Sequence, residues 1–153
     1  MSSDDQLPYA IVAGFGLPGR SAAEVLAAQH IPYAVIELNP EVVRRCLLVG
    51  IQMVCGDVRD PEVLRRAGID RATMLAICIP NDAAMLEAVP VARRLNSRVR
   101  IVVRCTLTST GLEAMKRGAD EAVVAEQAVA REMAKAVTGQ RGHRVETMAH
   151  PPV

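Results

Sequence analysis

The chain has 153 residues, of which half are hydrophobic and 23% are charged, a composition that fits a folded globular protein and argues against a disordered one. Its 18 basic and 17 acidic residues leave a net charge of +1, so the charge balance gives no reason to expect nucleic acid or an anionic membrane surface as a partner. No apolar run reaches the roughly 18 residues that a membrane-spanning helix requires.

The cysteines and histidines do not predict a metal site. The four cysteines, at positions 46, 55, 78 and 105, form no CxxC pair, and the three histidines are scattered, whereas a zinc site needs clustered ligands. Most of the cysteines lie in or beside apolar runs, which is typical of buried or half-buried thiols in a reducing compartment.

Short β-branched runs alternate along the chain with segments of helical spacing. The expected strands are Tyr9–Ala13, Tyr33–Glu37, Met53–Cys55, Met74–Ile79, Arg100–Val103 and Ala122–Val124. The expected helices begin near Pro18, Pro40, Pro61, Asp82, Thr108 and Glu126, and they end near Gln29, Gly50, Gly68, Leu95, Gly118 and Thr138. Asn39, Asp60 and either Asn81 or Asp82 are the expected N-caps.

This alternation predicts the fold class. Six strands separated by helices indicate an α/β protein with a parallel sheet, and right-handed crossovers make a Rossmann-like, doubly wound, six-stranded sheet of order 3-2-1-4-5-6 the default. Residues 9–138 are expected to form this single domain. A polar extension is expected over residues 1–8, and a flexible tail over 139–153, where the periodicity is lost.

The strongest motif is the stretch Gly14-Phe15-Gly16-Leu17-Pro18-Gly19, a GxGxxG that directly follows an expected strand and opens an expected helix. In such a loop Gly14 allows the tight turn, Gly16 lets a phosphate approach the backbone, and Gly19 lets the helix pack close to the sheet. The helix N-terminus adds N–H groups and a positive dipole for the phosphate. The motif predicts a phosphate-binding loop.

An acidic residue completes this fingerprint. Glu37 ends the second expected strand, 18 residues after Gly19, where a carboxylate accepts hydrogen bonds from ribose hydroxyls. It would repel a 2′-phosphate, so NADP is disfavoured. The alternative is a glycine-rich turn with an ordinary capping glutamate.

Other strand ends point to the same edge of the sheet, where ligands bind in open α/β proteins. Asp57 and Val58 follow the third strand, Ile79 ends the fourth, and Arg104 ends the fifth. Asp57 can instead serve as a turn cap, and the segment after Ile79 can be a plain helix N-cap.

The chain resembles a known family in several of these segments. They read IVAGFGLPG, YAVIELNPEVV, GDVRDPEVLRRAGID, AICIPNDAAM, RIVVRC and RGADEAVVAEQAVAREM. Over residues 9–138 the chain resembles the N-terminal domain of regulators of potassium conductance (RCK), also called the TrkA-N domain. It is most similar to the cytosolic domains of Kef-type and YbaL-like monovalent cation:proton antiporters.

The resemblance implies a regulatory domain that binds an adenine nucleotide (AMP, ADP, ATP or NAD(H)), pairs into homodimers and gates a transmembrane cation:proton antiporter unit from the cytosolic face of the inner membrane. Carried over to this sequence, the phosphate loop would be Gly14–Gly19 and Glu37 would hold the ribose. Asp57 and Val58 would line the adenine, and Arg104 would lie near the phosphates or the dimer contact. Leu38 and Ile79 complete the expected nucleotide-binding residues.

We expect no catalysis, because the expected elements leave no substrate domain and no constellation of catalytic side chains is evident. Two alternatives stay open: a nucleotide-binding fragment of an NAD-dependent oxidoreductase, and a dimerisation scaffold that has lost its ligand. Val129, Met133 and Val137 share one face of the last expected helix and offer a surface for assembly, or they cover the sheet. Met85, Leu86 and Val89 of the fourth expected helix are expected to cover the sheet.

Overall fold

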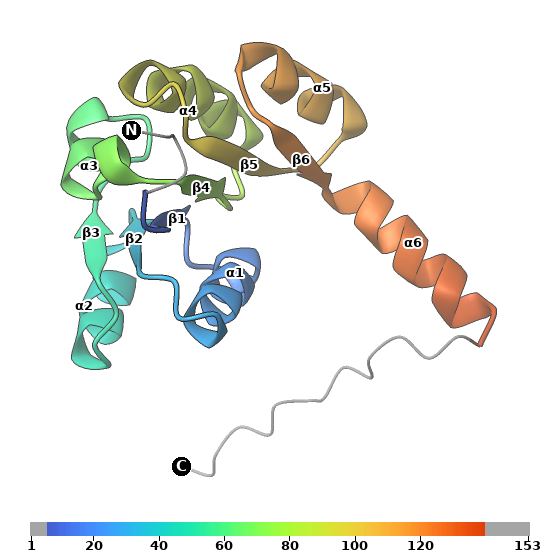
Figure 1. Cartoon of the computed structure of the whole chain (residues 1–153). Coiled ribbons are helices and arrows are strands. Elements are labelled where there is room, and N and C mark those ends of the chain that lie inside the picture. Colours follow the sequence, from blue (N-terminus) through green and yellow to red (C-terminus); the bar gives the residue numbers. More distant parts are fainter. Residues whose placement is uncertain (1–5, 140–153) are drawn as a thin grey trace, which may run out of the picture.

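The computed structural model describes residues 6–139 as a parallel sheet of six strands with helices on both faces (Figure 1). The strands are β1 Ala10–Ala13, β2 Tyr33–Glu37, β3 Met53–Cys55, β4 Met74–Ile77, β5 Arg100–Cys105 and β6 Glu121–Val124. The helices are α1 Leu17–Ala28, α2 Pro40–Leu48, α3 Pro61–Arg66, α4 Asp82–Leu95, α5 Thr108–Arg117 and α6 Ala125–Val137, with a 3₁₀ turn η1 at Ile69–Arg71. The expected tail falls outside the described residues except for Gly139, and only residues 6–8 of the expected N-terminal extension are described.

The expected strand order is confirmed. The sheet runs β3-β2-β1-β4-β5-β6, and every neighbouring pair is parallel. The order reverses between β1 and β4, so the carboxyl ends of these two strands diverge into loops on opposite faces. This topological switch point is where ligands bind in sheets of this kind.

Four strand boundaries differ from the sequence expectation: β1 begins at Ala10 and β6 at Glu121, each one residue from the expected start, and β4 and β5 end elsewhere. β4 ends at Ile77 rather than Ile79, because its neighbour β1 ends at Ala13; the amide of Cys78 still donates to the Ala13 carbonyl at 2.7 Å. β5 continues to Cys105 because β6 pairs with it there. The turn η1 was not expected, and it follows directly from Gly68, whose φ of +91° ends α3.

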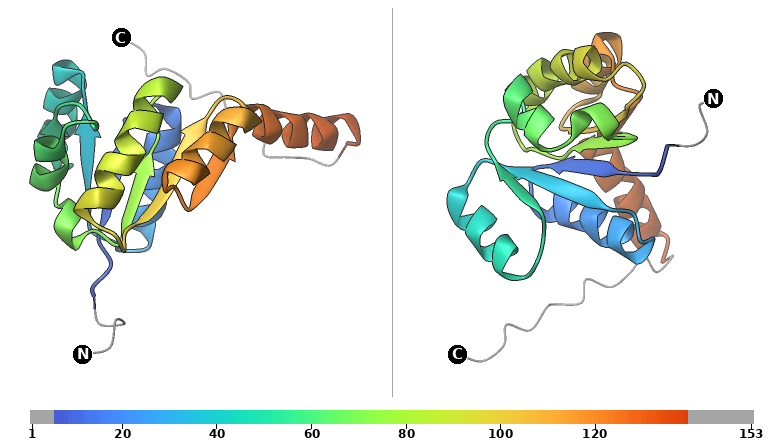
Figure 2. Two further views of the ribbon diagram at one scale, coloured as in Figure 1. Left: turned by 90° about the horizontal axis from the view of Figure 1, so that it is seen from above. Right: turned by 60° about the vertical axis from the view of Figure 1, so that its left-hand side comes forward.

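The helices form two layers (Figure 2). Helices α1 and α2 cover one face of the sheet, and α3, α4 and α5 cover the other. The larger hydrophobic cluster lies under α3–α5, and its fully buried members include Leu64, Leu75, Met85, Val89 and Ile101. The expectation that α4 covers the sheet is therefore confirmed.

Helix α6 is the exception to this layering. It extends from the edge strand β6 away from the rest of the molecule (Figure 2), and none of its residues is buried. Val129, Met133 and Val137 are 61%, 58% and 81% exposed, so within the described residues they do not cover the sheet.

Local sequence explains where most helices begin. The side chains of Asn39, Asp60 and Asn81 accept hydrogen bonds from amides in the first turns of α2, α3 and α4, at 2.8–2.9 Å. These expected caps are confirmed, and the cap of α4 is Asn81 rather than Asp82. Among the helices of residues 6–139, none has the length and hydropathy to span a membrane.

One expectation about the cysteines is wrong in part. Cys46 and Cys105 are buried and Cys78 is half-buried, but Cys55 is exposed. Cys55 is the last residue of β3, a three-residue strand at the edge of the sheet, so little of the protein covers it.

Candidate functional site

A cavity of about 640 Å³ opens at the carboxyl edge of the sheet, over the switch point between β1 and β4. Its volume lies in the range of small-molecule and cofactor pockets, about 300–1,000 Å³. The cavity is lined by Gly14, Phe15, Gly16, Leu17, Pro18, Ile36, Glu37, Leu38, Asn39, Gly56, Asp57, Val58, Arg59, Cys78, Ile79, Pro80, Asn81, Ala84 and Arg104. Residues from the carboxyl ends of β2 and β5, and from the segments that follow β1, β2, β3 and β4, thus meet at one place.

The glycine loop after β1 forms the floor of the cavity. Gly14 has a φ of +90°, a conformation that favours glycine, and its amide donates to the Ile36 carbonyl at 2.8 Å. A Cβ built on Gly19 would lie 1.8 Å from the carbonyl oxygen of Gly14. Gly19 therefore allows α1 to approach β1. Gly19 does not line the cavity, whereas the other eleven residues predicted to bind the nucleotide all do.

Gly16 requires a different explanation. Its backbone is extended, with φ −77° and ψ −165°, and a Cβ added there would meet no protein atom within 4 Å. Neither backbone strain nor packing within the chain calls for glycine at this position. Gly16 lines the cavity, so its missing side chain leaves space for a bound group to approach the backbone.

The N-terminus of α1 is uncapped, in contrast to those of α2, α3 and α4. Its N-cap is Gly16, which has no side chain that could accept the first-turn amides. Gly16, Leu17 and Pro18 line the cavity at this end of α1, so an anionic group bound there would meet the positive end of the helix dipole and could accept from the remaining first-turn amides.

Glu37 joins the end of β2 to the glycine loop. Its Oε2 accepts from the amide of Phe15 at 2.9 Å, and its Oε1 accepts from the amide of Asn39 at 3.0 Å. Each carboxylate oxygen has a second lone pair, so Glu37 can also accept from hydroxyl donors of a ligand. The carboxylate thus both fixes the loop and presents acceptors to the cavity.

An ion-pair cluster lies at the end of β3. Arg59 contacts both oxygens of Asp57, at 2.7 Å from Nη2 to Oδ2, and reaches Glu87 of α4 at 3.3 Å. These hydrogen bonds from Arg59 hold the pKa of Asp57 below its usual value. Val58, between Asp57 and Arg59, is buried against the core while also lining the cavity.

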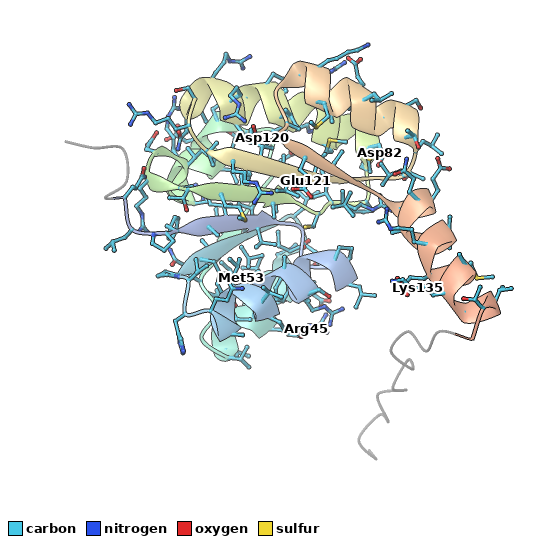
Figure 3. The ribbon with its side chains drawn as sticks, turned by 45° about the vertical axis from the view of Figure 1, so that its right-hand side comes forward. Arg45, Met53, Asp82, Asp120, Glu121 and Lys135 are labelled. Carbon is cyan, nitrogen blue, oxygen red and sulfur yellow. The ribbon has the colours of Figure 1, made fainter. Side chains whose placement is uncertain are left out.

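A second arginine lies on the other side of the switch point. Nη1 of Arg104 is 3.4 Å from Oδ1 of Asp82 and donates to the Pro80 carbonyl at 3.2 Å. The other oxygen of Asp82 accepts from the amide of Thr106 at 2.9 Å. Asp82, labelled in Figure 3, thereby ties the loop after β4 to the loop after β5.

Several cavity residues were not assigned to a site by the sequence analysis, chiefly Arg59, Cys78 and Ala84. Arg59 had a detectable signal, because an arginine two residues after a strand-end aspartate can fold back on it in a tight turn; its amide also donates to Asp57 Oδ1 at 2.9 Å. Burial raises the pKa of the Cys78 thiol to about 11, so this group is protonated at neutral pH. Within residues 6–139, no three metal-ligating side chains gather closely enough to hold a metal ion.

Comparison with known proteins decides the family. The model of the TrkA-N domain matches residues 10–125. The chain belongs to the TrkA-N domain family. This confirms the resemblance seen in the sequence, and with it the association of the fold with potassium transport, antiporters and nucleotide-binding Rossmann domains.

Named relatives are membrane transport proteins. The chain is 30% identical over 125 residues to the putative cation/proton antiporter YbaL of Escherichia coli, covering 82% of this chain and 22% of YbaL. It is 29% identical over 115 residues to potassium channel protein 1 of Methanocaldococcus jannaschii, covering 74% of this chain and 34% of the channel. The chain therefore spans about a fifth to a third of the length of these relatives.

Solved structures agree with the fold. The crystal structure of the TrkA-N domain of YbaL superposes with a TM-score of 0.81 at 29% identity, over 87% of this chain and 98% of that one. The AMP-bound form of the Kef C-terminal domain of Shewanella denitrificans superposes with a TM-score of 0.76 at 21% identity, over 88% of this chain and 82% of that one. At that lower identity the likeness concerns the fold alone.

Proposed function

We propose that this TrkA-N domain is a nucleotide-sensing regulatory domain of a membrane potassium or cation:proton antiporter, acting at the cytosolic face of the inner membrane. The observation that carries the proposal is the cavity itself, where the glycine loop, Glu37 and Asp57 meet at the switch point of the sheet. The relatives, named as an antiporter and a channel, favour regulation over the alternative of an oxidoreductase fragment.

The cavity suits an adenine nucleotide in one orientation. A phosphate fits at the uncapped N-terminus of α1, beside Gly16, where a Cβ would take the space. Glu37, the next residue along the edge of the sheet, presents acceptors for the ribose hydroxyls. The base then lies towards the end of β3, beside Asp57 and Val58.

The charges narrow the class of nucleotide. The Glu37 carboxylate repels a 2′-phosphate, so NADP is disfavoured relative to NAD(H), AMP, ADP and ATP. Arg104, across the switch point, is placed to meet phosphates that extend beyond the glycine loop. A neighbour of similar fold is described as AMP-bound, and the GsuK channel, of similar fold at 24% identity, as bound to NAD.

A sensing domain also needs an interface whose contacts change when the ligand binds. We propose that α6 docks on a second copy of this chain, forming a homodimer. Val129, Met133 and Val137 form an apolar stripe on a helix that buries none of its residues, and Val123 of the edge strand β6 adds to it at 45% exposed. Because α6 extends from the sheet edge, the stripes of two copies related by a two-fold axis can pack against each other.

The direct test is nucleotide binding by Gly16→Ala. Calorimetric titration with AMP and with NADH should give dissociation constants for the wild type, and the added methyl group should raise them at least about tenfold by blocking the phosphate, a cost comparable to losing one charge-assisted hydrogen bond. The extended backbone and open surroundings of Gly16 avoid strain, and the loss of the N-cap glycine should lower the melting temperature by only a few degrees.

Ser21→Ala is the matched control, because Ser21 is exposed on the same helix and does not line the cavity. It should leave both dissociation constants unchanged. Absence of binding by the wild type would refute the nucleotide assignment and leave a dimerisation scaffold. Equal binding by wild type and Gly16→Ala would show that the phosphate lies elsewhere.

A further inference from the structure

The segment after β3 contains an arginine whose role is not explained by the fold. The side chain of Arg59 is 43% exposed and lines the cavity. Its guanidinium lies between two carboxylates from different parts of the chain: Asp57, two residues before it, and Glu87 on α4. Its position in the cavity lining indicates a role towards a bound ligand.

The hydrogen bonds of Arg59 occupy most of the acceptor positions of Asp57. Oδ1 accepts from the Arg59 amide at 2.9 Å and from Nε at 3.1 Å. Oδ2 accepts from Nε at 3.2 Å and from Nη2 at 2.7 Å. The single Nε hydrogen is shared between the two oxygens, so three hydrogens occupy the carboxylate. A carboxylate offers about four lone-pair positions, so while Arg59 holds this arrangement Asp57 keeps at most one of them for a ligand donor.

This arrangement reverses the hydrogen-bonding character of the base end of the cavity. In the described part of the chain, Nη1 contacts only Glu87 and Nη2 contacts only Asp57, so each terminal nitrogen keeps a hydrogen to donate. While Arg59 is bound to Asp57, the cavity wall at the end of β3 offers the donors of Arg59. When Arg59 turns away, the same wall offers the acceptors of Asp57. At its 6-position a 6-oxo purine would present an acceptor to this wall, and a 6-amino purine would present a donor.

We propose that Arg59 determines which purine the cavity prefers, because it competes with the 6-amino group of adenine for the carboxylate of Asp57. The inference rests on the nucleotide-binding function proposed above. Glu87 is the second partner that receives the guanidinium when an adenine nucleotide takes Asp57, since Arg59 already contacts it at 3.3 Å. Arg59 thereby lowers the affinity for adenine nucleotides relative to hypoxanthine nucleotides.

The ionisation of Asp57 supports this competition. Its pKa lies below the usual value because of Arg59, and an exposed aspartate without that partner would still be ionised at neutral pH. Removing Arg59 therefore leaves a charged acceptor, which hydrogen-bonds a donor more strongly than a neutral one does.

The test compares AMP with inosine monophosphate, which differ only in the 6-position and the adjacent ring nitrogen. Dissociation constants of both should be measured by calorimetry for the wild type and for Arg59→Ala. The preference for AMP is expressed as the dissociation constant of inosine monophosphate divided by that of AMP. This ratio should rise about tenfold in Arg59→Ala, the effect of gaining one hydrogen bond to a charged group. The ratio cancels effects on the ribose and phosphate, which the two ligands share.

Three further comparisons make the result specific. Arg65→Ala removes an arginine that pairs with Glu62 on α3 and does not line the cavity, and it should leave the ratio unchanged. In an Asp57→Asn background, Arg59→Ala should no longer change the ratio, because the residue for which Arg59 competes is gone. Glu87→Gln should shift the ratio away from AMP, because Arg59 loses its second partner.

The outcomes separate this inference from the function on which it rests. If both nucleotides bind and Arg59→Ala leaves their ratio unchanged, the competition is refuted while nucleotide binding stands. A ratio that falls would show that Arg59 itself recognises adenine, which also refutes it. If neither nucleotide binds to the wild type, the proposed function fails and the inference fails with it.

Discussion

Helices α4 and α6 are alike in sequence and opposite in structure. They have 14 and 13 residues, and each carries apolar residues at helical spacing. Helix α4 follows the loop after β4, and α6 follows β6 directly. In α4 the residues Met85, Ala88 and Val89 are completely buried against the sheet. In α6 the corresponding stripe of Val129, Met133 and Val137 is exposed.

The difference shows what an amphipathic pattern does and does not specify. The pattern specifies that a helix forms and which face is apolar, but not which surface covers that face. The strand β5 that follows α4 returns the chain to the sheet and holds α4 against it, whereas no strand follows α6 in the described residues. An apolar stripe left open in this way is typical of an interface.

The largest expected effect is on the stability of the fold. Met85→Ala should lower the free energy of unfolding by about 3 kcal/mol, because it opens a cavity in the core under α4. Met133→Ala should change it by less than about 0.5 kcal/mol, because Met133 is solvated in the isolated chain. Urea denaturation of dilute protein measures both. Equal losses would mean that α6 is packed within its own chain.

The next effect concerns association. Met133→Asp should weaken the dimer at least about tenfold, because it places a charge in a contact that buries a methionine. Sedimentation equilibrium measures the dissociation constant. Leu48→Asp is the matched control, since Leu48 is an exposed apolar residue at the end of α2, 86% exposed. Similar weakening by both variants would show that the contact is not at α6.

A smaller effect is expected at the start of α4. Asn81→Ala should cost about 1 kcal/mol of stability, because the first-turn amide of Ala84 loses its acceptor. Helix α6 has no such cap: its N-cap is Val124, and no side-chain hydrogen bond is formed there. Thermal unfolding without nucleotide measures the change. An unaltered melting temperature would show that the backbone of α4 is held by packing alone.

The smallest effect is a change in one ionisation on α6. Lys135, which lies towards the outer end of α6 (Figure 3), contacts Glu132 at 2.7 Å and holds the pKa of that carboxyl below its usual value. Because the folded pKa is lowered, the pair contributes at neutral pH and its contribution is lost as the pH falls through that pKa. Lys135→Met should raise the pKa of Glu132 to the ordinary range, measured by NMR titration. An unshifted pKa in the wild type would show that Lys135 and Glu132 do not pair in solution.

Much of the fold could be predicted because local signals and topology agree. Asn39-Pro40 and Asp60-Pro61 mark helix starts by simple stereochemistry, and alternation of strands and helices leaves few allowed sheet orders. The ends of β4 and β5 could not be predicted in the same way. They depend on which neighbouring strand continues, and that is a property of the assembled sheet.

The candidate site shows the same division. The glycine loop and Glu37 have a spacing that follows from one strand-turn-helix unit, so the sequence predicts both. The turn of Arg59 back onto Asp57 has a signal in the sequence, whereas its contact with Glu87, 28 residues further along the chain, depends on how α4 packs. The motif predicts the packing role of Gly19, and the backbone geometry agrees with it, because a Cβ at Gly19 would clash with the carbonyl oxygen of Gly14.

Polar contacts connect the cavity to the first turn of α6. Arg104 contacts Asp82, and Asp82 accepts from the amide of Thr106 at 2.9 Å. The carbonyl of Thr106 accepts from the amide of Glu126 at 3.4 Å, so the loop after β5 touches both the cavity wall and α6.

The most direct test of the sensing function is the dimer dissociation constant, measured by sedimentation with and without saturating AMP, ATP or NADH. Coupling between two sites is typically worth about 1–3 kcal/mol, so at least one nucleotide should change the constant about fivefold or more. Because the coupling is reciprocal, the affinity of the nucleotide for the dimer should differ from its affinity for the monomer in the same direction. Nucleotide binding that leaves the dimer constant unchanged would contradict a sensor and indicate a bound ligand without a regulatory signal.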